Sequence, residues 1–383
     1  MIVTDRASGA RRLAILRLTL SDFRCYRFLR MDMDSRPVVL TGPNGAGKTN
    51  ILEALSLLTP GRGMRGARIA EIGRRDAGEG AAWGVAAALR GPDGEVEIAT
   101  GREAGAERRS VRIDGQPARN QMVLGETMSA IWLTPAMDRL FLEGSAGRRR
   151  FLDRLVLGAD PGHAARAAAY EHALRERARL LRAGGADARW LATLEEAMAE
   201  RGAAMAAARR SAVGRLNTRC AAGRGPFPAA ALTVAGVEEW LDEDGEEGVA
   251  GRLRQALAAS RRRDAEAGGA AEGPHRSDLK VVHVANGVAA ESCSTGEQKA
   301  LLIAILLAHA QVLAEERGAA PILLLDEVAA HLDADRRAAL FDELRGLDAQ
   351  SWLTGTDEAV FAGLGADAQF FRVAAATATR VAQ

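Results

Sequence analysis

Apolar residues recur with two different periods along the chain, and the change of period divides it into regions. Residues 13–20 and 38–41 are short apolar runs, which predict buried strands. Between residues 80 and 116 apolar and polar positions alternate between glycine-bearing turns, as at Val111 and Ile113, which predicts an antiparallel sheet. From about Asp138 onward the apolar residues take helical spacing. A sheet region is therefore followed by a helical one.

The middle of the chain predicts a compact group of helices. Helical spacing runs through residues 147–157, 163–182 and 187–221, with Pro161 as a break. Gly184 and Gly185 form a short turn, so the two longer helices should pair as an antiparallel hairpin. The longest helix would reach only about 50 Å and lacks sustained heptads, which favours a lobe over a coiled-coil arm. Residues 260–273 hold few apolar side chains and predict a partly disordered linker.

The last third returns to sheet-forming patterns. Residues 279–284, 321–325 and 351–354 predict strands, residues 300–311 and 336–347 predict helices, and Asn286-Gly287 predicts a hairpin turn. The fold class is therefore α/β, a mixed sheet with an inserted helical lobe. We expect one half of the sheet domain over residues 1–135, the helical lobe over 136–272, and the other half over 273–383.

The turn after the second strand matches the phosphate-binding pattern G-x-x-x-x-G-K-[ST]. Its residues are Gly42, Pro43, Asn44, Gly45, Ala46, Gly47, Lys48 and Thr49, and residues 48–58 continue with helical spacing. Glycines let consecutive N–H groups point at phosphate oxygens, and the helix adds its positive end. In this pattern Lys48 reaches the β- and γ-phosphates of ATP and Thr49 ligates Mg²⁺. The alternative is an ordinary glycine turn, but its place between a strand and a helix favours ATP.

A second candidate lies where the strand at residues 322–325 ends in Asp326 and Glu327. In an open α/β sheet, ligands bind at the carboxyl ends of the strands. Asp326 would hold Mg²⁺ and Glu327 would orient and deprotonate an attacking water. A buried strand can also end in two acids for no catalytic reason. The phosphate-binding pattern in the same chain favours the functional interpretation.

A third candidate is the start of the helix predicted at residues 300–311. Residues 293–299 read Cys-Ser-Thr-Gly-Glu-Gln-Lys. Ser294 and Glu297 form a capping box, which any helix start can use. The same geometry offers a hydroxyl and free N–H groups to an anion, such as a γ-phosphate. Its place before the acidic strand favours the second interpretation.

Composition limits the class of protein. The chain has 383 residues, 26% of them charged, and a net charge of +1, so it is globular and not uniformly basic. Its three cysteines are far apart in sequence and predict neither a disulfide framework nor a zinc site. The N-terminus has no apolar core of a signal peptide, and the longest apolar run, residues 300–308, is too short to span a bilayer. We expect a cytoplasmic protein without a membrane partner.

The order of these motifs resembles the ABC-type ATPases, and more narrowly the SMC-like heads of the RecF family. The landmarks of the resemblance run from about residue 13 to 356, and only the phosphate loop is diagnostic alone. They are residues 20–26, 42–50, 58–65, 148–153, 273–278, 293–299, 322–327, 330–333 and 351–356.

The resemblance implies a mechanism with two copies of the chain. Ser294 and Gly296 of one copy would complete the site in which Gly42–Asn50 of the other copy hold ATP, and Asp333 would lie at the seam of the dimer. ATP would join the copies and slow hydrolysis would release them. The family implies a homodimer that clamps single-stranded, gapped or junction DNA. It also implies the partners RecR and RecO, RecA loading, and a role in the SOS response.

The sequence departs from the ABC pattern at several positions. Thr295 stands where the signature usually has glycine, and Cys293 where it has leucine. Thr354 and Thr356 occupy the region where transporters place a switch histidine. Gln121 is available for the glutamine loop but is not assigned to it. These differences suggest slow hydrolysis and not loss of binding.

Arginines supply the candidate DNA contacts, because guanidinium groups pair well with phosphates. Arginine is also the general cation of this chain, so a solvated face is the alternative. His275 and Arg276 could bind DNA, contact the second copy in the dimer, or fix the entry of the next strand. The candidates are Arg62, Arg65, Arg74, Arg75, Arg148, Arg149, Arg150 and Arg154.

Two other functions stay open at this point. An ABC-type subunit could act as a nucleotide switch for a protein or membrane partner, although transporter inserts are shorter than the insert of about 130 residues expected here. A scaffold that binds ATP without hydrolysing it is the other possibility.

Overall fold

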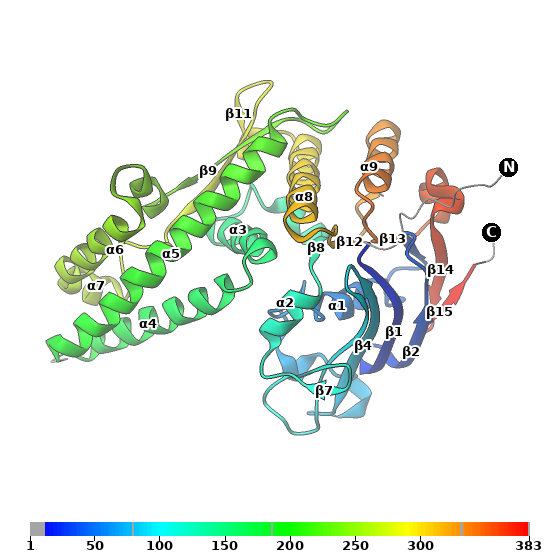
Figure 1. Ribbon diagram of the computed structural model, residues 1–383, viewed down its shortest axis with the longest axis horizontal. Coiled ribbons are helices and arrows are strands. Elements are labelled where there is room, and N and C mark those ends of the chain that lie inside the picture. The colour runs from blue at the N-terminus through cyan, green and yellow to red at the C-terminus, as the bar shows by residue number, and fades with distance from the viewer. Residues whose placement is uncertain (1–11, 79, 185–186, 330–331, 382–383) are drawn as a thin grey trace. The chain divides into compact units, whose positions relative to one another are not determined.

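The computed structural model describes residues 12–78, 80–184, 187–329 and 332–381 (Figure 1). The chain divides into two compact units. The first, the head unit, comprises Met1–Asp138, Gly225–Phe227 and Leu306–Gln383, and the second, the helical unit, comprises Arg139–Arg224 and Pro228–Ile305. Residues 273–305 thus group with the helical unit, whereas the sequence placed them with the second half of the sheet domain.

An antiparallel sheet forms one part of the head unit, as the alternation over residues 80–116 predicted. Its strands follow the order β2-β1-β4-β5-β6-β7. Buried positions alternate with half-buried ones along β4, because one face of the sheet packs on the core. The strands are β1 Ala14–Phe23, β2 Tyr26–Asp32, β4 Trp83–Gly91, β5 Gly94–Arg102, β6 Ser110–Ile113 and β7 Gln116–Pro117.

A second sheet, mostly parallel, carries the candidate site of the head unit. Its order is β15-β14-β3-β13-β12-β8, and only β15 runs antiparallel to its neighbour. Every residue of β3 and β12 is buried, which explains why these strands are uninterrupted apolar runs. The strands are β3 Val38–Thr41, β8 Ala130–Leu133, β12 Ile322–Leu325, β13 Ser351–Gly355, β14 Gln369–Ala374 and β15 Thr377–Arg380. The helices of this unit are α1 Lys48–Ser56, α2 Leu124–Thr127 and α9 Ala334–Gly346.

The helical unit is built on the predicted hairpin of two long helices (Figure 1). α4 and α5 pack against each other, and Tyr170, Met198 and Met205 belong to their shared core. A short sheet of order β11-β10-β9 accompanies them. The elements are α3 Ser145–Ala159, α4 His163–Ala183, α5 Ala188–Cys220, β9 Ala230–Ala235, α6 Leu241–Ala259, α7 Arg261–Ala267, β10 Asp278–His283 and β11 Val288–Ala289.

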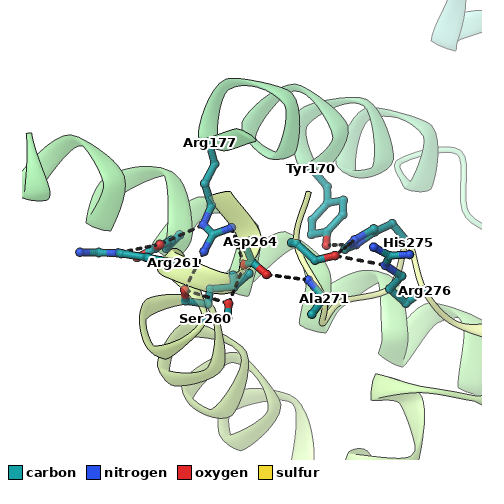
Figure 2. Close-up of polar contacts among 11 residues, drawn as sticks. Tyr170, Arg177, Ser260, Arg261, Asp264, Ala271, His275 and Arg276 are labelled. Carbon is teal, nitrogen blue, oxygen red and sulfur yellow. Dashed lines mark hydrogen bonds and ion pairs between the residues drawn. The ribbon is translucent and has the colours of Figure 1, made fainter. Parts of the chain in front are cut away.

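The predicted linker at residues 260–273 is wrong, because α7 occupies Arg261–Ala267. Asp264 is buried and accepts hydrogen bonds from Arg177 Nη1 at 2.8 Å and from Ser260 Oγ at 2.6 Å (Figure 2). Arg177 also donates to the buried carboxylate of Glu195 at 2.9 Å. Buried ion pairs therefore order this segment. Because the residues that order it are charged, the sequence shows no apolar period here.

One helix, α8 Thr295–Arg317, begins in the helical unit and ends in the head unit. Among the described residues it alone is long and apolar enough by composition to cross a membrane. However, 83% of its most apolar window is buried inside the protein. α8 is therefore a core helix, which agrees with the buried helix predicted at residues 300–311.

Candidate functional site: the phosphate loop and its acidic strand

The loop between β3 and α1 has the backbone that the phosphate-binding pattern predicted. Gly42, Gly45 and Gly47 have φ angles of 147°, 78° and 113°, which side chains with a Cβ rarely adopt. A Cβ on Gly42 would lie 2.1 Å from the Val373 carbonyl oxygen, and one on Gly47 would lie 2.5 Å from the Tyr26 hydroxyl. Both glycines are therefore required by neighbouring strands as well as by the turn.

The loop leaves its tip open and the helix behind it uncapped. Pro43, Asn44 and Gly45 are exposed, and Ala46 is half-buried. Gly47 is the N-cap of α1 and provides no side-chain cap, so the N–H groups that precede Asn50, whose own N–H donates to the Gly47 carbonyl, can meet an anion. A phosphate at this position would meet both the loop amides and the positive end of the helix.

Lys48 is only 4% exposed and folds back over the loop. Its Nζ donates to the carbonyl oxygens of Gly42 at 2.7 Å and Pro43 at 3.0 Å. Burial lowers the pKa of Lys48, and the nearby carboxylates of Glu327 and Asp326 oppose that shift. The ammonium group therefore lies within electrostatic reach of both acids that the sequence singled out.

One oxygen atom joins the phosphate loop to two strands of the parallel sheet. Asp326 Oδ1 accepts from Thr49 Oγ1 at 3.0 Å and from Thr354 Oγ1 at 2.7 Å. Asp326 is 6% exposed, and its own N–H donates to Leu133 of β8 at 2.9 Å. Hydroxyl and carboxylate oxygens are the ligands that Mg²⁺ prefers. Thr49 and Asp326 thus fit the ion predicted for them, with further ligands to come from bound phosphate and water.

Thr354 is the residue whose role the sequence did not find. Its hydroxyl donates to Asp326 and accepts from the Glu327 N–H at 2.9 Å. Glu327 has a φ of 54°, a conformation that a residue with a Cβ adopts only when its surroundings impose it. The sequence noted Thr354 only as the place of an absent histidine. The structure shows that it holds both acids.

Asn50 and the turn between β1 and β2 meet beside the loop. Asn50 donates to Cys25 Sγ at 3.2 Å and accepts from Arg65 at 2.9 Å. Arg65 and Arg24 both pair with Glu53 of α1, which is 2% exposed. The resemblance motifs at residues 20–26 and 58–65 therefore converge on α1.

The signature residues lie in the helical unit, at the start of α8. Ser294 and Glu297 form the predicted capping box: Ser294 N donates to Glu297 Oε2 at 2.8 Å, and Glu297 N donates to Ser294 Oγ at 3.3 Å. Ser294, Thr295 and Gly296 are exposed, whereas Cys293 is buried. The role of this helix start toward a nucleotide stays a prediction.

Asp333 and Gln121 have local partners. Asp333 is the N-cap of α9 and accepts from Arg336 N at 2.8 Å, and its side chain is exposed. Gln121 accepts from Arg109 Nη2 at 2.7 Å. Ala330 and His331 of the same resemblance motif lie outside the described residues.

The arginines proposed to contact DNA differ in how exposed they are and in whether they already have a partner. Arg148 is 8% exposed and makes a bidentate pair with Asp278, at 2.7 Å and 2.9 Å. Arg149 is half-buried and donates to the Ser277 carbonyl at 2.7 Å, while Arg150 is exposed. Arg148 is therefore better explained as a structural ion pair, and only Arg150 of this cluster faces solvent freely. Arg62 and Arg65 of the head unit are exposed.

The motif at residues 273–278 has a structural role that the sequence left open. His275 Nε2 lies 3.0 Å from the Ala270 carbonyl, which can only accept, so Nδ1 of the neutral ring accepts from the Tyr170 hydroxyl at 2.7 Å (Figure 2). Burial lowers the pKa of His275, which favours that neutral form. Ser277 donates to the buried Glu238. These bonds fix the entry of β10.

Comparison with known proteins decides the family. Residues 14–377 match the family described as RecF/RecN/SMC N terminal domain. The chain is 50% identical to the DNA replication and repair protein RecF of Rhizobium etli over 367 residues, which cover 95% of this chain and 98% of that relative. The chain belongs to the RecF family. The RecF protein of Mesorhizobium japonicum is also 50% identical, over 364 residues that cover 94% of this chain and 96% of the relative.

Solved structures show that the likeness to the RecF fold extends over 98% of the chain. One described as the recombination mediator protein RecF-ATPrS in the RecFOR pathway has a TM-score of 0.85 at 22% identity, covering 98% of this chain and 100% of that one. An Smc head domain from Pyrococcus furiosus has a TM-score of 0.55 at 17% identity, covering 96% of each chain. The predicted fold class, an ABC-type ATPase head of the SMC kind, is thereby confirmed.

Proposed function

We propose that this chain is an ATP-dependent DNA-binding protein of recombinational repair and replication restart. The observation that carries the proposal is the shared oxygen of Asp326, which brings the Thr49 hydroxyl and the end of the acidic strand together. That arrangement supports a site for a magnesium–nucleotide complex. The names of the RecF relatives support the connection with DNA replication and repair.

In this proposal the head unit supplies the residues that bind ATP. The amides of residues 42–50 surround the phosphates, and Lys48 exchanges its two carbonyl partners for phosphate oxygens. Thr49 and Asp326 would hold Mg²⁺, and the ion would supply positive charge to the phosphates. Glu327 positions the attacking water and accepts its proton. Hydrolysis is expected to be slow, because the sequence departs from the ABC pattern at Cys293, Thr295 and Thr354.

The helical unit supplies the second half of the site, from a second copy of the chain. Ser294 and Gly296 are exposed at the N-terminus of the 23-residue helix α8, where a γ-phosphate would meet free N–H groups. Binding would require Ser294 to give up its bond to Glu297. Asp333, exposed at the start of α9, would lie at the seam. ATP thereby favours a homodimer, and hydrolysis releases it.

The dimer would clamp DNA at gaps or junctions between single and double strands. Exposed arginines, among them Arg62, Arg65 and Arg150, would bind phosphates without reading sequence. RecR and RecO would be the partners, and the result would be RecA loading and support of the SOS response in the cytoplasm. A RecF structure assigned to the RecFOR pathway supports this choice of partners.

Sedimentation of the full chain with Mg²⁺, ATP and a gapped duplex tests the proposal. We expect a dimer with ATP and a monomer without it. Lys48→Ala should abolish ATP binding and dimerisation, whereas Lys280→Ala, at an exposed lysine paired with Asp278, should behave as the unchanged chain. Unchanged ATP affinity in Lys48→Ala, measured by calorimetry, would refute the site.

Two further variants separate hydrolysis from dimerisation. Glu327→Gln should bind ATP and accumulate as a dimer, because the water is not activated. Ser294→Arg should bind ATP as a monomer and fail to dimerise. If Ser294→Arg loses ATP binding as a monomer, the signature does not act on a partner's nucleotide.

A further inference from the structure

A hollow of about 610 Å³ lies in the head unit, among residues that the phosphate site does not use. Its walls come from the end of α1, the resemblance motif at residues 58–65, the segment 67–72 and the loop between β5 and β6. Leu57, Ile69 and Ile72 give it apolar surface. Its volume is that of a site for a small molecule or a few side chains.

Two arginines that line this hollow, Arg102 and Arg109, have no carboxylate partner among the described residues. Arg102 is 6% exposed; it donates to the Ala81 carbonyl at 2.9 Å, and its buried Nε has no partner. Arg109 donates to the carbonyl oxygens of Leu57 and Thr59 and to the Gln121 amide. Burial lowers the pKa of Arg109 to about 10, with no acidic group to oppose it.

The charge of the hollow is unbalanced. Arg62 and Arg68 line it as well, and Glu107 is the one carboxylate among its described lining residues. A buried charge that lacks a counter-charge is unfavourable, so an anionic ligand would be stabilised here more than on an open surface. Arg102 Nε is buried and has no hydrogen-bond partner among the described residues, so the hydrogen-bonding capacity of this guanidinium is not fully used within the chain.

We propose that the hollow binds an acidic segment of a partner protein. Carboxylates would pair with Arg102 and Arg109, as planar guanidinium groups favour, and an apolar side chain beside them would fill the space against Leu57 and Ile69. Duplex phosphates reach exposed arginines and not recessed ones. Single-stranded nucleic acid is bound by stacking of bases on aromatic rings, and the described lining residues include none.

Peptide display on the full-length chain tests this inference without ATP, so its failure is distinct from failure of the proposed function. A library of random octapeptides is selected on the chain and then bound to variants by fluorescence anisotropy. We expect enriched peptides to carry two or more acids next to an apolar residue. Arg102→Met and Arg109→Met should weaken their binding about tenfold or more.

Matched variants distinguish peptide binding in the hollow from nonspecific attraction between acidic peptides and surface arginines. Arg90→Met removes an exposed arginine of β4 that pairs with Glu95, and it should leave peptide affinity unchanged. Ala106→Phe fills the hollow while keeping every arginine, and it should weaken binding as much as loss of Arg102. Circular dichroism of each variant establishes that it is folded.

The remaining outcomes overturn the inference. Selection of no peptide, selection of peptides without acids, or binding to Arg102→Met and Ala106→Phe as tight as to the unchanged chain would each do so. If oligothymidylate displaces the selected peptide and its own affinity falls in Ala106→Phe, the hollow is a nucleic-acid site instead.

Discussion

The two units bury arginine in opposite ways. In the helical unit, Arg148, Arg177 and Arg209 are buried and each contacts at least one carboxylate: Asp278 for the first, Glu195 and Asp264 for the second, and Asp153 and Glu238 for the third. In the head unit, Arg102 is equally buried and contacts a single carbonyl.

The buried arginines of the helical unit stabilise the fold through ion pairs, whereas Arg102 has no such pair and is one of the residues that we propose to bind a ligand. A buried pair whose hydrogen bonds are satisfied is costly to break, although it adds little over an apolar core. Figure 2 shows such a case, in which Arg177 of α4 extends to Asp264 of α7. Arg102 has no such arrangement among the described residues, so structure alone does not explain its burial.

The largest effect is expected from Arg177→Met. The change leaves Asp264 buried without a guanidinium partner and Glu195 with Arg261 alone, and breaking a buried pair in this way costs about 3–5 kcal/mol. Urea unfolding followed by hydrogen exchange of α4 and α5 measures it. The control is Arg179→Met on the same helix, where an exposed pair with Glu176 should cost less than about 1 kcal/mol. Equal losses in the two variants would contradict the structural role of Arg177.

Acid should weaken the helical unit through Asp153. Burial alone would raise the pKa of Asp153, but hydrogen bonds from His163 and Arg209 outweigh it and lower the pKa to about 2. A carboxyl whose folded pKa is depressed stabilises the fold above its unfolded pKa near 3.8, and that stability is lost as pH falls toward 2. The loss is about 2 kcal/mol.

The pH dependence of the unfolding free energy measures this contribution. Asp153→Asn should lower stability near neutral pH and flatten the decline between about pH 4 and about pH 2. An unchanged slope in that variant would assign the acid sensitivity to other carboxylates.

The contrast between the head unit and the helical unit also explains which parts of the structure the sequence predicts and which it does not. The phosphate loop, α1 and the strand before Asp326 follow from local patterns: glycines at fixed spacing, an apolar period, and acids where a buried strand ends. The shared oxygen between Thr49 and Asp326 joins residues 277 positions apart and required only that these elements meet at one sheet edge.

The helical unit was less accessible because its order depends on distant charged pairs. Arg148 looked like a free cation in sequence, yet its partner Asp278 is 130 residues away. α7 has almost no apolar period, and Asp264 orders it through Arg177. β9 was overlooked although its buried residues alternate at Ala230, Leu232 and Val234, a signal that a strand search could have found.

A smaller effect is expected from Tyr170→Phe, which tests the role of the motif at residues 273–278. Loss of the hydroxyl removes one hydrogen bond to His275 Nδ1 and should cost about 1 kcal/mol of unfolding free energy. DNA affinity, measured by anisotropy with a gapped duplex, should not change. If the variant keeps its stability but binds DNA more weakly, His275 contributes to DNA binding.

The smallest effect is expected from Arg102→Met, and it bears most directly on the difference between the units. The substitution removes one hydrogen bond to Ala81 and also removes a buried charge, so the two contributions oppose each other. The unfolding free energy of the head unit should change by less than about 1 kcal/mol. Arg177→Met, by comparison, should lower the unfolding free energy of the helical unit by about 3–5 kcal/mol. Urea unfolding followed by exchange of β4 and β5 amides measures it. A loss as large as that of Arg177→Met would make Arg102 a structural residue, and the contrast between its burial and that of Arg177 would then disappear.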